Sequence, residues 1–260
     1  MSEIPADWIW DQDAVKDTPS ARRGMTLDEE DRLRREGVKI IMEIGKLMKL
    51  KLSPTLGPAA VFFHRFYMVN SFQEHPREMA ALGCLFLAGK VEETPKKCRD
   101  LAVMARNKFP SLYDRHRNLI DEIMAYERII LHSLNYVLVI EMPYRHIVDY
   151  VTAFHLAPDQ SKMVIQTAWT FVNDSLATNI CLCWEPEIIA VALTKLALTM
   201  KRLEERPGPN WWDQYVANLP VDMIEEICHR VLDLYGLAET FDFMTNQNSE
   251  SPATPVTPLS

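Results

Sequence analysis

Glycine is scarce in this sequence, and its eight copies never form the clusters that bind phosphate. No two of them stand in a G-x-G arrangement. Neither Gly45-Lys46-Leu47 nor Gly89-Lys90-Val91 has the Ser or Thr that follows the lysine of a P-loop. The G-x-S-x-G motif of hydrolases and the H-E-x-x-H motif of zinc peptidases are also missing. These absences argue against the common nucleotide-binding, esterase and metallopeptidase enzymes.

Residues for a metal centre or an acid–base centre are equally sparse. None of the seven histidines is followed by aspartate, and the adjacent glutamate pairs would point to different faces of a helix. The five cysteines form no C-x-x-C motif, and the spacing of Cys181 and Cys183 is not that of a usual zinc site. His64 lies in an apolar helical stretch, where we predict a hydrogen-bonded core histidine. We expect no catalytic residue, no metal and no cofactor, with reduced thiols.

Basic charge and long apolar runs are lacking as well. A net charge of −8 and a pI near 5.4 argue against a nucleic-acid-binding surface. The uncharged run Met79–Gly89 has eleven residues, which are too few to cross a bilayer. The N-terminus, MSEIPADWIW, is acidic and has no long apolar core. We therefore expect no signal peptide and a soluble intracellular protein.

What the sequence does contain is helical periodicity. Apolar residues recur every three or four positions, alternating β-branched runs are absent, and prolines precede most of the apolar stretches. This pattern predicts an all-α fold of two consecutive five-helix units, each with a nearly uncharged third helix. In the first unit we expect helices over 28–50, from Pro58, from Pro76, from Thr94-Pro95 and over 113–136. In the second unit we expect helices over 143–155, 158–177, 185–204, 210–218 and 220–236.

The predicted organisation has four parts: an N-terminal extension over 1–27, units over 28–140 and 141–238, and a disordered tail over 239–260. Trp8 and Trp10 in the extension should pack on the domain surface or on a partner, because two tryptophans do not stay in water. The polar, proline-rich tail cannot bury enough surface to fold. Its candidate sites for a proline-directed kinase, each directly before a proline, are Ser251, Thr254 and Thr257.

The run LFLAGKVEETPKK, the helix containing AYERIIL and the two successive five-helix units resemble the cyclins over roughly residues 28–237. The resemblance implies that each unit is a cyclin box and that the chain is a regulatory subunit without chemistry of its own. A cyclin docks its first box on a cyclin-dependent kinase and pushes the kinase αC helix inward, which completes the Lys–Glu pair that positions ATP. Matching positions imply a kinase-binding surface made of Leu87, Lys90, Val91, Glu92, Glu127, Tyr136 and Leu138.

The physical character of Lys90 and Glu127 agrees with this implication. Lys90 leaves a helix that is apolar all round, where an unpaired ammonium group is costly. Glu127 lies in an otherwise apolar stretch between Ile123 and Ile130. We predict that Lys90 and Glu127 pair and also offer hydrogen bonds to kinase backbone. Loss of either partner would cost about 2–5 kcal/mol if the pair is fully buried.

Within the family, the chain resembles the transcriptional cyclins. The cell-cycle cyclins carry a substrate-docking patch with a tryptophan on helix one, where this chain has Arg34 to Gly37 and then Ile40. The resemblance implies a nuclear protein whose kinase, of the transcription-elongation class, phosphorylates the C-terminal repeats of RNA polymerase II. It implies no direct contact with nucleic acid or membrane.

Two alternatives remain open. A TFIIB-type general transcription factor also uses two cyclin-like repeats, but it would predict a basic repeat surface and usually a cysteine-rich zinc ribbon, and the sequence has neither. The second alternative is a helical scaffold that binds no kinase.

Overall fold

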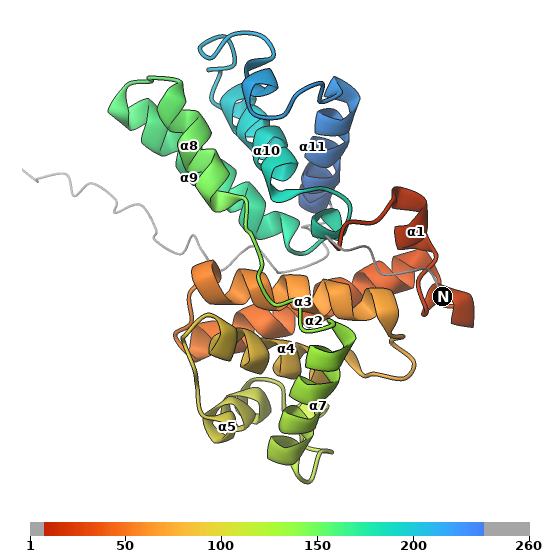
Figure 1. The fold of residues 1–260 in the computed structure, drawn as a ribbon. Helices are drawn as coiled ribbons and strands as arrows, with labels where there is room; N and C mark the ends of the chain where they lie inside the picture. Colours follow the sequence, from red (N-terminus) through yellow and green to blue (C-terminus); the bar gives the residue numbers. More distant parts are fainter. Residues whose placement is uncertain (1–7, 237–260) are drawn as a thin grey trace, which may run out of the picture.

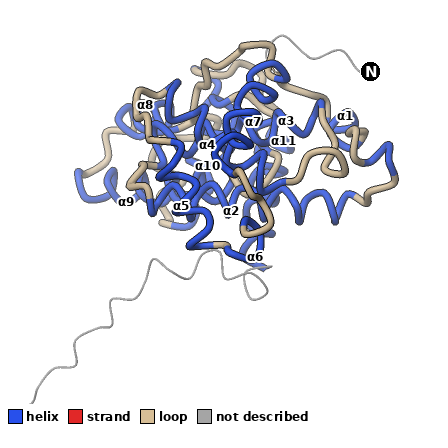
Figure 2. Tube along the Cα trace, turned by 90° about the horizontal axis from the view of Figure 1, so that it is seen from below, coloured by secondary structure: helices blue, strands red, loops and turns tan. Residues whose placement is uncertain are grey.

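The computed structural model describes residues 8–236, and these residues form helices without any strand (Figures 1 and 2). The predicted all-α class is confirmed. No helix within this range has the length and apolar character needed to cross a membrane.

The N-terminal segment contains α1 (Gln12–Lys16) and η1 (Ala21–Arg23). The first unit contains α2 (Leu27–Leu47), η2 (Leu52–Leu56), α3 (Gly57–Val69), α4 (Arg77–Val91), α5 (Cys98–Lys108), α6 (Pro110–Tyr113) and α7 (Leu119–Ser133). The second unit contains α8 (Tyr144–Ala153), α9 (Pro158–Ser175), η3 (Ile180–Leu182), α10 (Pro186–Met200), η4 (Trp211–Gln214) and α11 (Val221–Gly236).

Helix starts follow local signals in the sequence. The Thr26 side chain caps α2 by accepting a hydrogen bond from the Glu29 backbone N–H at 3.2 Å. Pro58, Pro158 and Pro186 occupy the first or second position of α3, α9 and α10, where a missing N–H costs nothing. The starts predicted from these residues are therefore correct.

Each unit is built around one helix that is buried on nearly all sides. In the first unit α4 packs against α2, α3 and α7, and in the second α10 packs against α8, α9 and α11. Gly83 lets α4 and α7 approach each other closely, because a Cβ at this position would lie 2.9 Å from Tyr126 Cβ and 2.6 Å from Ile130 Cδ1. The small residues of α4 thus let α7 lie directly against it.

Helix boundaries differ from the prediction in the fourth and fifth helices of the first unit. Thr94 does not open a helix. Its backbone N–H donates to Gly89 O at 2.8 Å and its hydroxyl lies 2.9 Å from that of Thr55, so it closes the end of α4, and α5 begins only at Cys98. The predicted helix over 113–136 begins at Leu119 and ends at Ser133, and Asn135 and Tyr136 beyond it have positive φ.

The predicted helix over 210–218 is only the 3-10 turn η4. Trp211 and Trp212 in this turn are both buried. Asn210 and Asn218 have positive φ on either side of the turn. The second unit therefore has four α-helices, with a turn in place of the predicted fourth helix, and both tryptophans pack in the core.

The second unit stacks on the first, and the segment after α7 connects them (Figure 1). His64 on α3 is completely buried, and its Nε2 lies 2.9 Å from the carbonyl oxygen of Leu176 in the second unit. Burial, followed by the charge of Arg34, lowers the pKa of His64 to about 3. The histidine is therefore neutral, and Nε2–H donates to Leu176. This confirms the prediction of a hydrogen-bonded core histidine.

The two tryptophans of the N-terminal segment also pack against the protein, as predicted. Trp8 and Trp10 are 1% and 5% exposed, and their rings meet edge to face with centroids 5.4 Å apart. The guanidinium of Arg65 lies 5.4 Å from the centroid of the Trp8 ring, which is a cation–π contact.

Candidate functional site

Lys90 stands in the last turn of α4, where that buried helix reaches the surface beside α7. Its Nζ donates to both carboxylate oxygens of Glu127, at 2.6 Å and 2.8 Å. The predicted pairing of Lys90 with Glu127 is confirmed. A cation in the last turn also complements the negative end of the helix dipole.

The pair is less buried than its place in the sequence suggested. The Lys90 side chain is 48% exposed, whereas that of Glu127 is 15% exposed. The condition of full burial, on which the cost of 2–5 kcal/mol rested, is not met. A half-exposed ion pair typically contributes at most about 1 kcal/mol to stability.

Phe86 is a third member of this site that the sequence reasoning missed. The ammonium of Lys90 lies 4.3 Å from the centroid of the Phe86 ring, which is a cation–π contact. The signal was available, because residues four apart on a helix share a face. Glu127 and Phe86 together hold the lysine in one direction and leave part of its ammonium group open to solvent.

The predicted neighbours of Lys90 on α4 have different environments. Val91 and Glu92, at the end of the helix, are half-buried, and burial raises the pKa of the Glu92 carboxyl. Leu87 is 4% exposed and belongs to the core. Val91 and Glu92 are thus accessible beside the ion pair, whereas Leu87 can act only by supporting it from below.

Tyr136 and Leu138 lie beyond the end of α7. Tyr136 is 65% exposed with a positive φ of 61°, and Leu138 is half-buried. The neighbouring Val137 and Val139 are 40% and 90% exposed. Exposure of several large apolar side chains in one short segment is typical of an interaction surface.

The described residues offer little for metal or thiol chemistry. No group of three or more His, Cys, Asp or Glu side chains among residues 8–236 is placed to hold a metal ion. All five cysteines are free, and burial raises the thiol pKa of Cys181 to about 12 and that of Cys228 to about 11. The predicted tail sites Ser251, Thr254 and Thr257 lie outside the described residues.

Comparison with known proteins gives one matching family and a set of related chains. Residues 11–139 match the family described as cyclin, N-terminal domain. The chain is 42% identical over 242 residues to Cyclin-K of Homo sapiens, covering 88% of this chain and 41% of that protein. It is 41% identical over 242 residues to Cyclin-K of Danio rerio, covering 88% of this chain and 55% of that protein. The chain thus spans about half the length of these relatives.

Solved structures share the fold at lower identity. A chain in the CAK complex of Chaetomium thermophilum has a TM-score of 0.72 and 20% identity, with 92% of this chain and 80% of that chain covered. A chain in the yeast RNA Pol II CTD kinase CTDK-1 complex has a TM-score of 0.70 and 17% identity, with 90% and 74% covered.

The sequence segments FFHRFYM, KVEETPKK and WEPEIIAVA resemble cyclin K in particular, and the comparison agrees. A cyclin N-terminal domain over the first unit, with high identity to cyclins over nearly the whole chain, establishes the relationship. The protein belongs to the cyclin family.

Proposed function

We propose that this cyclin is the non-catalytic, activating subunit of a cyclin-dependent kinase of the transcription-elongation class. The observation that carries the proposal is Lys90, which is held by Glu127 and Phe86 at the exit of the buried helix α4 and remains half exposed. The contribution of this half-exposed pair to the fold is small, at most about 1 kcal/mol, and the open side of the ammonium group is available to a partner.

The chemistry of the site suits recognition of a kinase backbone. An ammonium group has three N–H donors, and two of those of Lys90 point to Glu127. The third is free to donate to a carbonyl oxygen of the kinase, next to its αC helix. Val91, Glu92, Tyr136 and Leu138 extend the contact on either side, and Leu87 supports α4 from the core. An inward αC helix then completes the kinase's own Lys–Glu pair.

The class of kinase is inferred from the related proteins. The chain is similar to Cyclin-K, and a chain that shares its fold belongs to the CTDK-1 complex, which is named as an RNA Pol II CTD kinase. We therefore assign RNA polymerase II C-terminal repeats as the substrate of the complex, and the nucleus as its location. In this proposal residues 28–140 form the first cyclin box and 141–238 the second.

Recovery of a kinase from nuclear extract tests the proposal. Wild type should recover a kinase that phosphorylates polymerase C-terminal repeat peptides. Lys90→Glu should recover at least about tenfold less of this kinase, because repulsion replaces a charged hydrogen bond. Lys162→Glu on α9 is the matched control, because it makes the same charge change at an exposed lysine of the second unit.

A double variant separates folding from binding. Lys90→Glu with Glu127→Lys restores an ion pair within the protein but presents the wrong charge to the kinase, so it should fold and still fail to recover the kinase. If wild type recovers no active kinase, or if Lys90→Glu recovers it as well as Lys162→Glu does, the proposed interface is wrong. Binding of wild type to duplex DNA in the same extract would favour the TFIIB-type alternative.

A further inference from the structure

The N-terminal segment over residues 8–25, here named the strap, touches both cyclin boxes. It leaves the second box at Trp10, passes α2 at Thr18 and reaches the loop between α3 and α4 at Ser20. The strap therefore joins parts of the protein that are far apart in the sequence.

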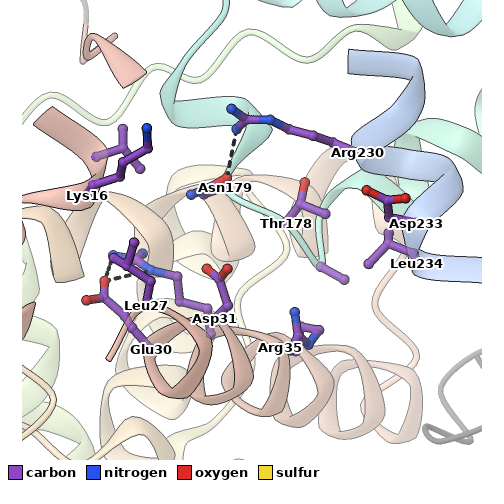
Figure 3. Close-up of a pocket in the computed structure, with 13 residues that line it drawn as sticks. Lys16, Leu27, Glu30, Asp31, Arg35, Thr178, Asn179, Arg230, Asp233 and Leu234 are labelled. Atoms are coloured by element: carbon purple, nitrogen blue, oxygen red, sulfur yellow. Dashed lines mark hydrogen bonds and ion pairs between the residues drawn. The ribbon is translucent and has the colours of Figure 1, made fainter. Parts of the chain in front are cut away.

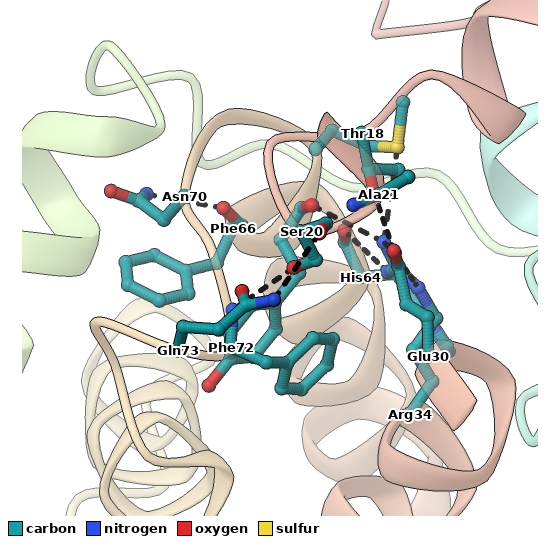
Figure 4. Close-up of polar contacts among 12 residues, drawn as sticks. Thr18, Ser20, Ala21, Glu30, Arg34, His64, Phe66, Asn70, Phe72 and Gln73 are labelled. Atoms are coloured by element: carbon teal, nitrogen blue, oxygen red, sulfur yellow. Dashed lines mark hydrogen bonds and ion pairs between the residues drawn. The ribbon is translucent and has the colours of Figure 1, made fainter. Parts of the chain in front are cut away.

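On the first box, the strap is bound through two side chains that are completely buried. The hydroxyl of Thr18 donates to the carboxylate of Glu30 on α2 (Figure 4). The hydroxyl of Ser20 accepts a hydrogen bond from the Phe72 backbone N–H at 3.0 Å, and the Ser20 carbonyl accepts one from Gln73 Nε2 at 3.2 Å. These bonds fix the strap to α2 and to the loop that precedes α4.

On the second box, the strap is bound through its backbone and one amide. The backbone N–H of Trp10 donates to Leu182 O at 2.8 Å. Gln12 Nε2 donates to Glu226 Oε2 on α11 at 2.8 Å, and the other oxygen of that carboxylate accepts from Arg230 at 2.7 Å. The strap thus has hydrogen-bonded anchors in both boxes, and Trp8 at its start adds a cation–π contact with Arg65 of the first box.

A continuous series of buried polar contacts links Thr18 to the second box. Glu30 accepts hydrogen bonds from the Arg34 guanidinium at 2.6 Å and 3.0 Å, and Arg34 donates to the carbonyl of His64 at 3.1 Å. His64 in turn donates to Leu176 of the second box. Glu30, Arg34 and His64 are all at least 97% buried, so a hydrogen bond lost in this series is not replaced by water at low cost.

Beside this series, the two boxes do not pack closely. A cavity of about 300 Å³ lies between α2, the strap, the loop after α9 and α11. Figure 3 shows Lys16 of the strap, Asp31 of α2 and both Arg230 and Asp233 of α11 around it. The strap lines this cavity through Val15 and Lys16, so it spans the space between the two boxes on this side.

We propose that the strap is a clamp that fixes the orientation of the second cyclin box on the first, with anchors that depend on each other. Release of the Thr18 anchor frees the Trp10 and Gln12 anchor, and the reverse also holds. If the two anchors were independent, altering one of them would release only that end of the strap.

Hydrogen exchange on the full-length protein tests this through the opposite end of the strap. Thr18→Val, which keeps the shape and removes the hydroxyl, should speed exchange of the Trp10 amide by about tenfold or more, because a buried hydrogen bond to a charged group is lost. Gln12→Leu should likewise speed exchange of the Phe72 amide in the first box. Thr18→Ser should restore wild-type protection, since it returns the hydroxyl.

Thr170→Val on α9 is the matched control, because the hydroxyl of this exposed threonine donates only within its own helix. It should leave the Trp10 and Phe72 amides unchanged. Faster exchange confined to the Thr18 end in Thr18→Val and to the Gln12 end in Gln12→Leu would overturn the clamp. Wild-type protection of both amides in both Thr18→Val and Gln12→Leu would also overturn the clamp, provided that circular dichroism shows both variants to be folded.

Discussion

Glu127 accepts two hydrogen bonds from Lys90, yet the carboxylate is largely buried whereas the lysine is half exposed. The two partners therefore do not depend equally on each other. Without Glu127, the ammonium group can turn to water. Without Lys90, a carboxylate in a mostly apolar setting loses its counter-charge.

This asymmetry predicts unequal effects of the two truncations on stability. Lys90→Ala should lower the free energy of unfolding by about 1 kcal/mol, and Glu127→Ala by less than about 0.5 kcal/mol. Urea denaturation followed by circular dichroism measures both. Equal losses would contradict the unequal dependence of the two partners on each other. Both variants should bind the kinase more weakly than their stability alone explains.

The close crossing at Gly83 predicts a strong effect of a single methyl group. In Gly83→Ala the new Cβ would lie 3.2 Å from the backbone carbon of Tyr126 and closer still to two side-chain atoms. Since backbone cannot move aside cheaply, we expect a loss of about 1–3 kcal/mol, measured as a lower urea midpoint. Gly89→Ala on the same helix meets only the carbonyl of Thr94 at 3.4 Å, and should be neutral or gain up to about 1 kcal/mol.

The neutral His64 predicts loss of stability in mild acid. Its folded pKa of about 3 lies below the ordinary value of 6.5, so the unfolded chain takes up the proton first as the pH falls below 6.5. Stability is therefore lost as the pH falls from 6.5 towards 3, by about 2 kcal/mol at pH 5 relative to pH 7.

A matched pair of variants isolates this contribution of His64. His64→Gln keeps an N–H donor but does not titrate, so its free energy of unfolding should fall less steeply between pH 7 and pH 5 than that of wild type. His229→Gln, at an exposed position on α11, should keep the wild-type slope. The same slope in His64→Gln and wild type would contradict a neutral buried His64.

The tail supplies a prediction about modification in the active complex. Ser251, Thr254 and Thr257 each precede a proline, and in the proposed complex they belong to the same assembly as the kinase, which would raise their effective concentration. Incubation of the purified complex with ATP should phosphorylate at least one of the three, as read by mass spectrometry. Dilution should not slow the reaction, because it occurs within one complex. A rate that falls with dilution would show modification between complexes instead.

The sequence predicted the elements whose signals are local. Prolines located the starts of α3, α9 and α10, because capping and helical periodicity act over a turn or two. The pairing of Lys90 with Glu127, which are 37 residues apart, instead came from the resemblance to the cyclins, and the apolar surroundings of both charges agreed with it.

The errors came from residues whose role is set by distant partners. Thr94 looks like an N-cap followed by a proline, but Gly89 and Thr55 hold it at the end of α4, and only the folded protein brings Thr55 near. The strap shows the same limit. Packing of its tryptophans was predictable from their apolarity, whereas the anchors at Glu30 and Glu226 join positions with no local relation in the sequence.

Burial of α4 on nearly all sides has a consequence for how the proposed kinase partner would meet this cyclin. Gly83 lets α7 lie directly on α4, so the helix that carries Lys90 has no room to tilt or rotate in small steps. The face is therefore a rigid template whose shape exists before any partner arrives. In the proposed complex the conformational entropy lost on association falls mainly on the kinase, and its αC helix is the element that adapts.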